Sequence, residues 1–243
     1  MKTTSKRQSI MCIVLILVML IGIWKGPQYV NMLTNADAEV SERVAQVASS
    51  GETQEMRAIW ISYLDFASAG VSKMSVNKFQ NYINKMFDNC VKLKMNTVIV
   101  QVRPMGDAMY KSKYFPWSVV ASGKQGRSPG YDPLKCMVSV AHKRGLSIHA
   151  WINPYRVTLS GTNVNQLSTS NYARKWKKSS SASKKRNVLS LEGKLYYNPA
   201  KKEVQNLIVN GIKEIVVNYD VDGIHFDDYF YPALGKNYKS NFD

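Results

Sequence analysis

Four short apolar segments, rich in β-branched residues, alternate along this chain with three amphipathic segments. The apolar segments, each of a length suited to one strand, are residues 57–64, 96–103, 146–153 and 221–227. The amphipathic segments repeat apolar side chains at helical spacing and cover residues 75–94, 131–145 and 198–219. Strands that alternate with helices form βαβ units with right-handed connections. The sequence therefore predicts an α/β fold with four parallel strands.

Capping signals mark the ends of the three predicted helices. Ser75 can cap the first helix, while Asp132 and Pro133 open the second, which Gly145 ends. The pair Asn198–Pro199 opens the third helix. No glycine-rich phosphate motif follows any predicted strand, which argues against a dinucleotide-binding fold.

Polar side chains occupy every second position toward the carboxyl end of each predicted strand. A side-chain period of two places each set on one face of the sheet. In a (β/α)₈ TIM barrel that face is the lumen, and its carboxyl-terminal mouth holds the active site. The pattern favours such a barrel, although each polar residue could instead be satisfied separately inside the core. The sets are Tyr63 and Asp65, with Ile59 and Ile61 behind them, then Gln101 and Arg103, then His149, Trp151 and Asn153, then His225 and Asp227.

Loops 103–117 and 153–157 add aromatic and polar side chains that we expect at the same rim. Aromatic rings beside carboxylates, amides and arginine suit a carbohydrate, because sugars offer apolar C–H faces for stacking and hydroxyls for hydrogen bonds. The loops therefore extend the predicted substrate-binding set. Their side chains are Asp107, Tyr110, Trp117, Tyr155 and Arg156.

Four motifs, taken in order, resemble the glycosyl hydrolase-like 10 family of bacterial cell-envelope proteins. They are RAIWISYLD, NTVIVQVRPMGDAMYKSKYFPWS, HAWINPYRV and DGIHFDDYFYP, and they extend across residues 56–232. The resemblance implies a (β/α)₈ barrel that acts on peptidoglycan glycan strands or a related wall polysaccharide. It also implies that the two carboxylates of HFDDYF belong to the active site.

The four predicted strands are half of what a complete barrel of about 250 residues requires. Residues 56–243 are therefore interpreted as the front half of the barrel domain. We expect a curved, open four-stranded sheet with helices on its outer face and with poorly covered inward side chains. Because an open sheet leaves strand edges unpaired, the chain alone is expected to be poorly soluble and inactive on peptidoglycan.

Glycoside hydrolysis uses two carboxyl groups, one as acid and one as base or nucleophile. Asp227, at the lumenal end of the fourth strand, is the first catalytic candidate. The adjacent Asp228 is expected to orient Asp227 or bind substrate hydroxyls, and repulsion within the pair would raise one pKa. Asp107 is one candidate for the second carboxylate, and a residue of the other half of the barrel is the alternative. Arg103 and His149 are expected to position the acids by hydrogen bonds.

Other interpretations of the Asp227–Asp228 pair remain open. Asp228 can cap the following helix, or the pair can bind a divalent cation. Tyr229, the next residue, joins the predicted substrate-binding set. The sequence predicts neither a metal site nor a cofactor.

The formal net charge of +16 attracts anions, so nucleic acid and anionic membrane or wall polymers are candidate partners. Basic residues precede an apolar run over 10–24, as in a signal peptide or membrane anchor. Residues 1–25 are interpreted as this segment and residues 26–55 as a flexible stalk, although a buried core helix is the alternative over 10–24. Such a segment predicts export to the outer face of the cell membrane or secretion to the envelope. Export disfavours nucleic acid as the partner.

The basic run over residues 173–187 is either a solvated loop or a surface that grips an anionic wall polymer. Cys12, Cys90 and Cys136 form neither a disulfide framework nor a metal motif, and the latter two are predicted core residues. A rival function is also open, namely a membrane-anchored glycan-binding protein without catalysis.

Overall fold

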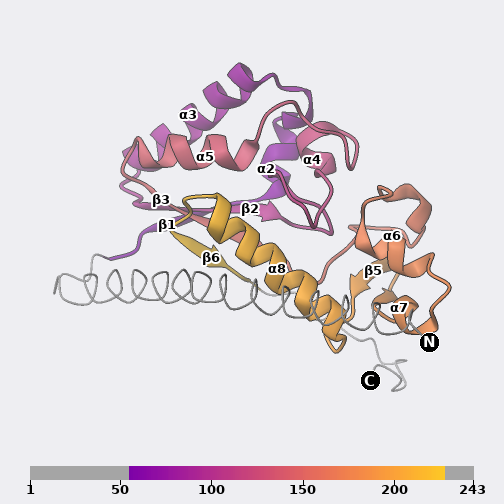
Figure 1. Cartoon of the computed structure of the whole chain (residues 1–243). Helices are drawn as coiled ribbons and strands as arrows, with labels where there is room; N and C mark the ends of the chain where they lie inside the picture. Colours follow the sequence, from indigo (N-terminus) through magenta and orange to yellow (C-terminus); the bar gives the residue numbers. More distant parts are fainter. Residues whose placement is uncertain (1–54, 228–243) are drawn as a thin grey trace, which may run out of the picture. The chain divides into compact units, whose positions relative to one another are not determined.

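The computed structural model describes residues 55–227 (Figure 1). The predictions for the anchor, for nearly all of the stalk, and for Asp228 and Tyr229 lie outside the described residues. Within residues 55–227, no helix combines the length and the apolar character that a membrane span requires.

A parallel four-stranded sheet forms the centre of the domain, as the sequence predicts. Its strands lie in the order β1-β2-β3-β6, and every neighbouring pair is parallel. The sheet therefore has one strand after another in chain order, with β6 at one edge. The strands are β1 (Ala58–Ile61), β2 (Thr97–Arg103), β3 (Ser147–Ile152) and β6 (Gly223–His225).

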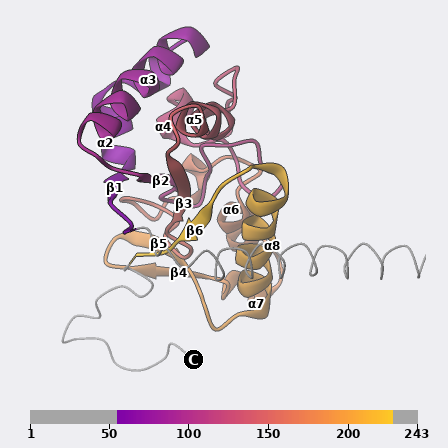
Figure 2. The ribbon, with the colours of Figure 1, turned by 90° about the vertical axis from the view of Figure 1, so that its left-hand side faces the viewer.

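Three longer helices connect these strands and follow one another around the sheet (Figure 2). They are α3 (Val76–Lys92), α5 (Pro133–His142) and α8 (Lys202–Asn218). The side chains of Ser75 and Asp132 cap α3 and α5, as predicted. The predicted start of the third helix at Asn198 is wrong, because the Asn198 side chain bonds to the Arg186 carbonyl and the Ala200 N–H instead.

The core lies between the sheet and this helix layer. Alternate residues of β2 and β3 point into it and are fully buried, as the strand period requires. Cys90 of α3 is buried with them, whereas Cys136 of α5 is only half-buried, and both are free thiols. The strand residues are Val98, Val100, Val102, Ile148, Ala150 and Ile152.

The first strand is shorter than predicted, because a helix begins directly after it. Helix α2 (Tyr63–Ser68) starts with a capping box: the Ser62 hydroxyl accepts from the Leu64 N–H, and the Asp65 carboxylate accepts from the Ser62 N–H at 2.7 Å. The predicted placement of Tyr63 and Asp65 on one face of a strand is therefore wrong. Asp65 caps a helix instead.

Residues 172–203 include a small lobe that the sequence reading took in part for a loop. The lobe contains α6 (Tyr172–Lys177), α7 (Ala182–Lys185) and the antiparallel hairpin of β4 (Val188–Leu191) and β5 (Lys194–Tyr197). Glu192 and Gly193 both have positive φ in its two-residue turn, which is the geometry that such hairpins prefer. Three short helices complete the described fold: η1 (Val71–Lys73), α4 (Val119–Ser122) and η2 (Val164–Gln166).

Candidate active site

The inner face of the sheet, which points away from α3 and α5, carries polar and aromatic side chains in two rows. Residues paired across parallel strands point the same way, so strand register identifies each row. The first row is Trp60, Ile99, His149 and Gly223, and the second is Gln101, Trp151 and His225. The alternation predicted for β3 and β6 is therefore confirmed.

A chain of hydrogen bonds joins three of the predicted site residues at the carboxyl edge of the sheet. The Gln101 side-chain amide donates to Asn153 Oδ1 at 2.5 Å, and Asn153 Nδ2 donates to Asp227 Oδ1 at 2.6 Å. The Tyr63 N–H donates to Gln101 Oε1 at 3.0 Å, which fixes the amide orientation. Gln101 and Asn153 are buried, so Asp227 is held by a rigid support.

Three aromatic rings form a platform on the same face. The Trp60 indole N–H donates to His225 Nε2 at 3.1 Å. The rings of Trp60 and Trp151 lie 5.8 and 6.2 Å from the His225 ring, centroid to centroid. The sequence analysis missed Trp60, which is 61% exposed, although its place between Ile59 and the buried Ile61 puts it on the opposite face of the strand.

His149 packs against the backbone of β6 and makes no hydrogen bond to Asp227 among the described residues. A Cβ built on Gly223 would come within 2.9 Å of the His149 ring, so only glycine permits this approach. The predicted role of His149 in positioning the catalytic acids is therefore not supported by geometry. The ring instead forms the half-buried floor beside the aromatic platform.

Arg103 leaves the inner face because of an irregularity in β2. The register shifts between Gln101, which pairs with Trp151, and Arg103, which pairs with Ile152. This β-bulge aligns Arg103 with a residue of the helix side. The guanidinium lies 4.3 Å from the centroid of the Phe115 ring, and neither of its terminal nitrogens has a partner. The prediction that Arg103 shares a face with Gln101 is wrong. Its terminal nitrogens make no hydrogen bond to Asp107, although its charge lowers the pKa of that carboxyl, so its role toward the acids stays a prediction.

Asp107 lies on the wall of a cavity of about 620 Å³ formed by α2, α4 and the loops after β2 and β3. Its Oδ2 accepts from the Gln125 side chain at 3.0 Å and from the Val119 N–H, whereas its buried Oδ1 has no partner. Burial is the main cause of a raised pKa at this carboxyl. Tyr63 lines the same cavity, and its N–H donates to Gln101, the first residue of the hydrogen-bond chain that reaches Asp227. The cavity therefore adjoins that chain.

The remaining predicted loop residues divide between surface and interior. Tyr110 is fully buried, with its ring edge-on to Tyr219, so its predicted place at the rim is wrong. Trp117 and Tyr155 are half-buried. An isolated antiparallel β-bridge pairs the backbone of Arg156 with that of Tyr196 in β5, and it connects the loop after β3 to the lobe. No cluster of three or more metal-ligating side chains occurs within residues 55–227.

The pKa of His149 predicts how stability depends on pH. Burial is the largest cause of its lowered pKa, which Asp222 opposes and His225 reinforces. The unfolded chain binds this proton near a pKa of about 6.5, and the folded chain binds it only at lower pH. The free energy of unfolding is therefore expected to decrease as the pH falls from about 6.5 through the folded pKa.

This dependence is measured by urea unfolding of the protein and of His149→Gln over the same pH series. The substitution is expected to remove the His149 part of the slope, and His142→Gln is expected to keep it. Equal slopes for the protein and His149→Gln would contradict the assignment.

Comparison with known proteins identifies relatives along the whole domain. The family model described as Glycosyl hydrolase-like 10 matches residues 55–241. Glycosyl hydrolase YngK of Bacillus subtilis is 42% identical over 190 residues, which are 76% of this chain and 35% of that protein. Glycosyl hydrolase DigH of Escherichia coli K12 is 39% identical over 189 residues, or 74% of this chain and 43% of that protein. The chain thus spans less than half the length of these relatives.

Among solved structures, alpha-L-fucosidase isoenzyme 2 from Paenibacillus thiaminolyticus is similar with a TM-score of 0.46 and 14% sequence identity. The similarity covers 72% of this chain and 24% of that chain.

Proposed function

Because this chain belongs to the glycosyl hydrolase-like 10 family, we propose that its protein cleaves glycosidic bonds in peptidoglycan glycan strands or a related wall polysaccharide. The observation that carries the proposal is the Gln101–Asn153–Asp227 chain, which holds a carboxylate at the carboxyl edge of three adjacent strands. In a (β/α)₈ barrel this edge is the catalytic mouth. The four parallel strands with a polar inner face support our proposal that the fold is part of such a barrel.

The proposed mechanism is acid–base catalysis by carboxyl groups. Asp227 acts at the glycosidic bond, and the amide of Asn153 fixes its orientation by donating to Oδ1. Asp107 or Asp228 supplies the second carboxyl group. The raised pKa of Asp107 favours a protonated acid. The site is proposed to act outside the cell membrane, on the cell envelope.

The aromatic platform supports a carbohydrate as the ligand. Trp60 exposes most of its indole ring beside His225, and a sugar can stack its C–H face on such a ring. Trp60→Ala is expected to weaken glycan binding by about tenfold, which is typical of an exposed aromatic anchor. Affinity is measured by calorimetry with purified glycan strands.

The matched control for this variant is Leu64→Ala, which truncates another exposed apolar side chain close by in the sequence, on α2. Its affinity for glycan is expected to be unchanged. A loss of the same size in both variants would contradict the stacking role of Trp60.

The proposed function is tested by incubating the protein, purified as it occurs in the cell, with peptidoglycan glycan strands freed of peptides. We expect new reducing ends to accumulate. Binding without any new reducing ends would favour the rival function, a non-catalytic glycan-binding protein. Absence of both binding and cleavage would reject the proposed substrate.

A further inference from the structure

Half of the protein's formal charge lies in the lobe. Residues 172–201, up to the start of α8, contain nine Lys and Arg and one Glu, a net charge of +8 out of +16 for the chain. None of these basic residues forms a salt bridge within residues 55–227. The lobe therefore presents an uncompensated positive field, which attracts a polyanion.

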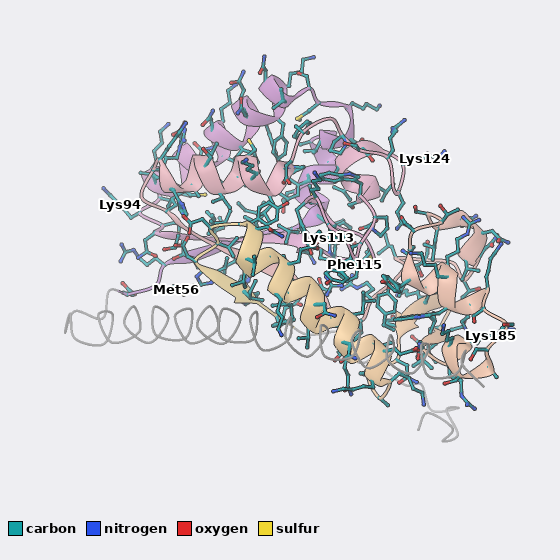
Figure 3. The ribbon with its side chains drawn as sticks, in the orientation of Figure 1. Met56, Lys94, Lys113, Phe115, Lys124 and Lys185 are labelled. Carbon is teal, nitrogen blue, oxygen red and sulfur yellow. The ribbon has the colours of Figure 1, made fainter. Side chains whose placement is uncertain are left out.

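The basic residues are carried by folded helices and not by a loop. Lys184, Lys185 and Arg186 are exposed at the end of α7, Lys175 is exposed on α6, and Lys178 is exposed directly after it. Figure 3 shows Lys185 at the outer end of the lobe, away from the sheet. Because the helices are ordered, the backbone positions of these charges are set before a ligand binds.

A cavity of about 370 Å³ lies between the lobe and α8, directly beside this charge. The half-buried ring of Tyr172 packs 5.3 Å from that of Trp176, centroid to centroid, and forms part of its wall. On the α8 side, Asn206 and Asn210 present exposed amides one turn apart. Lys184 lines the cavity and contributes a cation.

Glu203 is the acidic side chain of this cavity, and a structural hydrogen bond occupies it. Its carboxylate accepts from the buried Asn187 side chain, which links the start of α8 to the lobe. The negative charge of Glu203 offsets that of Lys184 inside the cavity. The net positive charge therefore lies on the exposed cations of α6 and α7 around it.

We propose that the lobe binds an anionic sugar- or polyol-based polymer. One unit of the polymer occupies the cavity, and the neighbouring units lie along α6 and α7. Amides and an aromatic wall suit hydroxyls and C–H groups, and the lysines suit phosphate or carboxylate groups. Single-stranded nucleic acid is less well matched, since Trp176 is only 7% exposed and base stacking needs free ring faces. The proposal is independent of cleavage at the inner face.

The test measures binding of the protein to four probes at several salt concentrations. Polygalacturonate supplies carboxylates, poly(glycerol phosphate) supplies phosphates, dextran is neutral, and single-stranded DNA tests the nucleic-acid alternative. We expect one or both of the first two polymers to bind with an affinity that falls as salt rises. Which of the two binds more tightly identifies the anionic group. Equal binding of dextran, tighter binding of DNA, or no binding of either polyanion would overturn the proposal.

Charge reversal locates the surface. The triple variant Lys184→Glu, Lys185→Glu, Arg186→Glu is expected to weaken polymer binding by about tenfold or more. The matched control Lys78→Glu, Lys85→Glu, Lys92→Glu makes the same charge change on exposed positions of α3 and should bind normally. Equal losses in the two variants would attribute binding to net charge alone and would reject the lobe as the site.

A double variant separates the cavity from simple charge attraction. Asn206→Ala with Asn210→Ala should weaken binding of the sugar or polyol polymer and leave binding of inorganic polyphosphate unchanged. If both ligands are unaffected, the cavity has no part and the proposal fails. If the glutamate variant does not fold, the triple replacement by glutamine keeps the charge test available.

Discussion

Asp227→Asn is expected to lower the rate of glycan cleavage by about 10²–10⁴-fold, the usual contribution of a positioned acid or base. Asparagine has nearly the volume of aspartate, but its amide neither takes up nor releases a proton at neutral pH. Its carbonyl oxygen can still accept from Asn153 Nδ2, so the support at the carboxyl edge of the sheet remains. The melting temperature is therefore expected to change little.

Asp222→Asn is the matched control for this variant. Asp222 precedes β6 at the opposite end of the sheet, where its carboxylate accepts from the Ile148 N–H at 2.8 Å and contacts His142. This variant is expected to lose stability and to keep its cleavage rate. Full activity of Asp227→Asn, or a large loss of its stability, would mean that Asp227 is structural and would transfer the catalytic role to Asp228.

The strand pattern predicts the inner face well because one face of a parallel sheet is a repeating environment. Counting by two along β3 places His149 and Trp151 on one face with Asn153, whose side chain donates to Asp227. The count holds wherever the pleat is regular. Its success at β3 and β6 therefore follows from their uninterrupted register.

The count fails where the backbone departs from a regular strand. The bulge after Gln101 turns Arg103 to the other side, and no residue type in VQVR reveals that shift. The capping box at Ser62 and Asp65 was visible in the sequence, since a serine followed three residues later by an acid is a helix-start signal. The Glu192–Gly193 turn also had a signal, a glycine between two short segments that each contain apolar residues, Val188–Leu191 and Lys194–Tyr197.

Phe115→Ala is expected to reduce the free energy of unfolding by about 3–5 kcal/mol, the cost of emptying a buried aromatic site. The ring is 4% exposed and lies between the Arg103 guanidinium, 4.3 Å from its centroid, and Gly211 of α8. A Cβ on Gly211 would come within 2.5 Å of the ring, so helix and ring are in close contact (Figure 3). Truncation also removes the ring face from a buried cation that has no other partner at its terminal nitrogens.

Urea unfolding measures this loss, and two further variants give it a scale. Phe115→Leu retains most of the buried volume and should cost less than the alanine variant, whereas Val119→Ala, at a 48% exposed side chain, should stay within about 0.5 kcal/mol. A cost near that of Val119→Ala would contradict the packing of Phe115. Because the bulge directs Arg103 away from the inner face, Phe115→Ala should still cleave glycan at temperatures where it remains folded. A loss of cleavage without unfolding would instead connect this stack to the proposed catalytic edge.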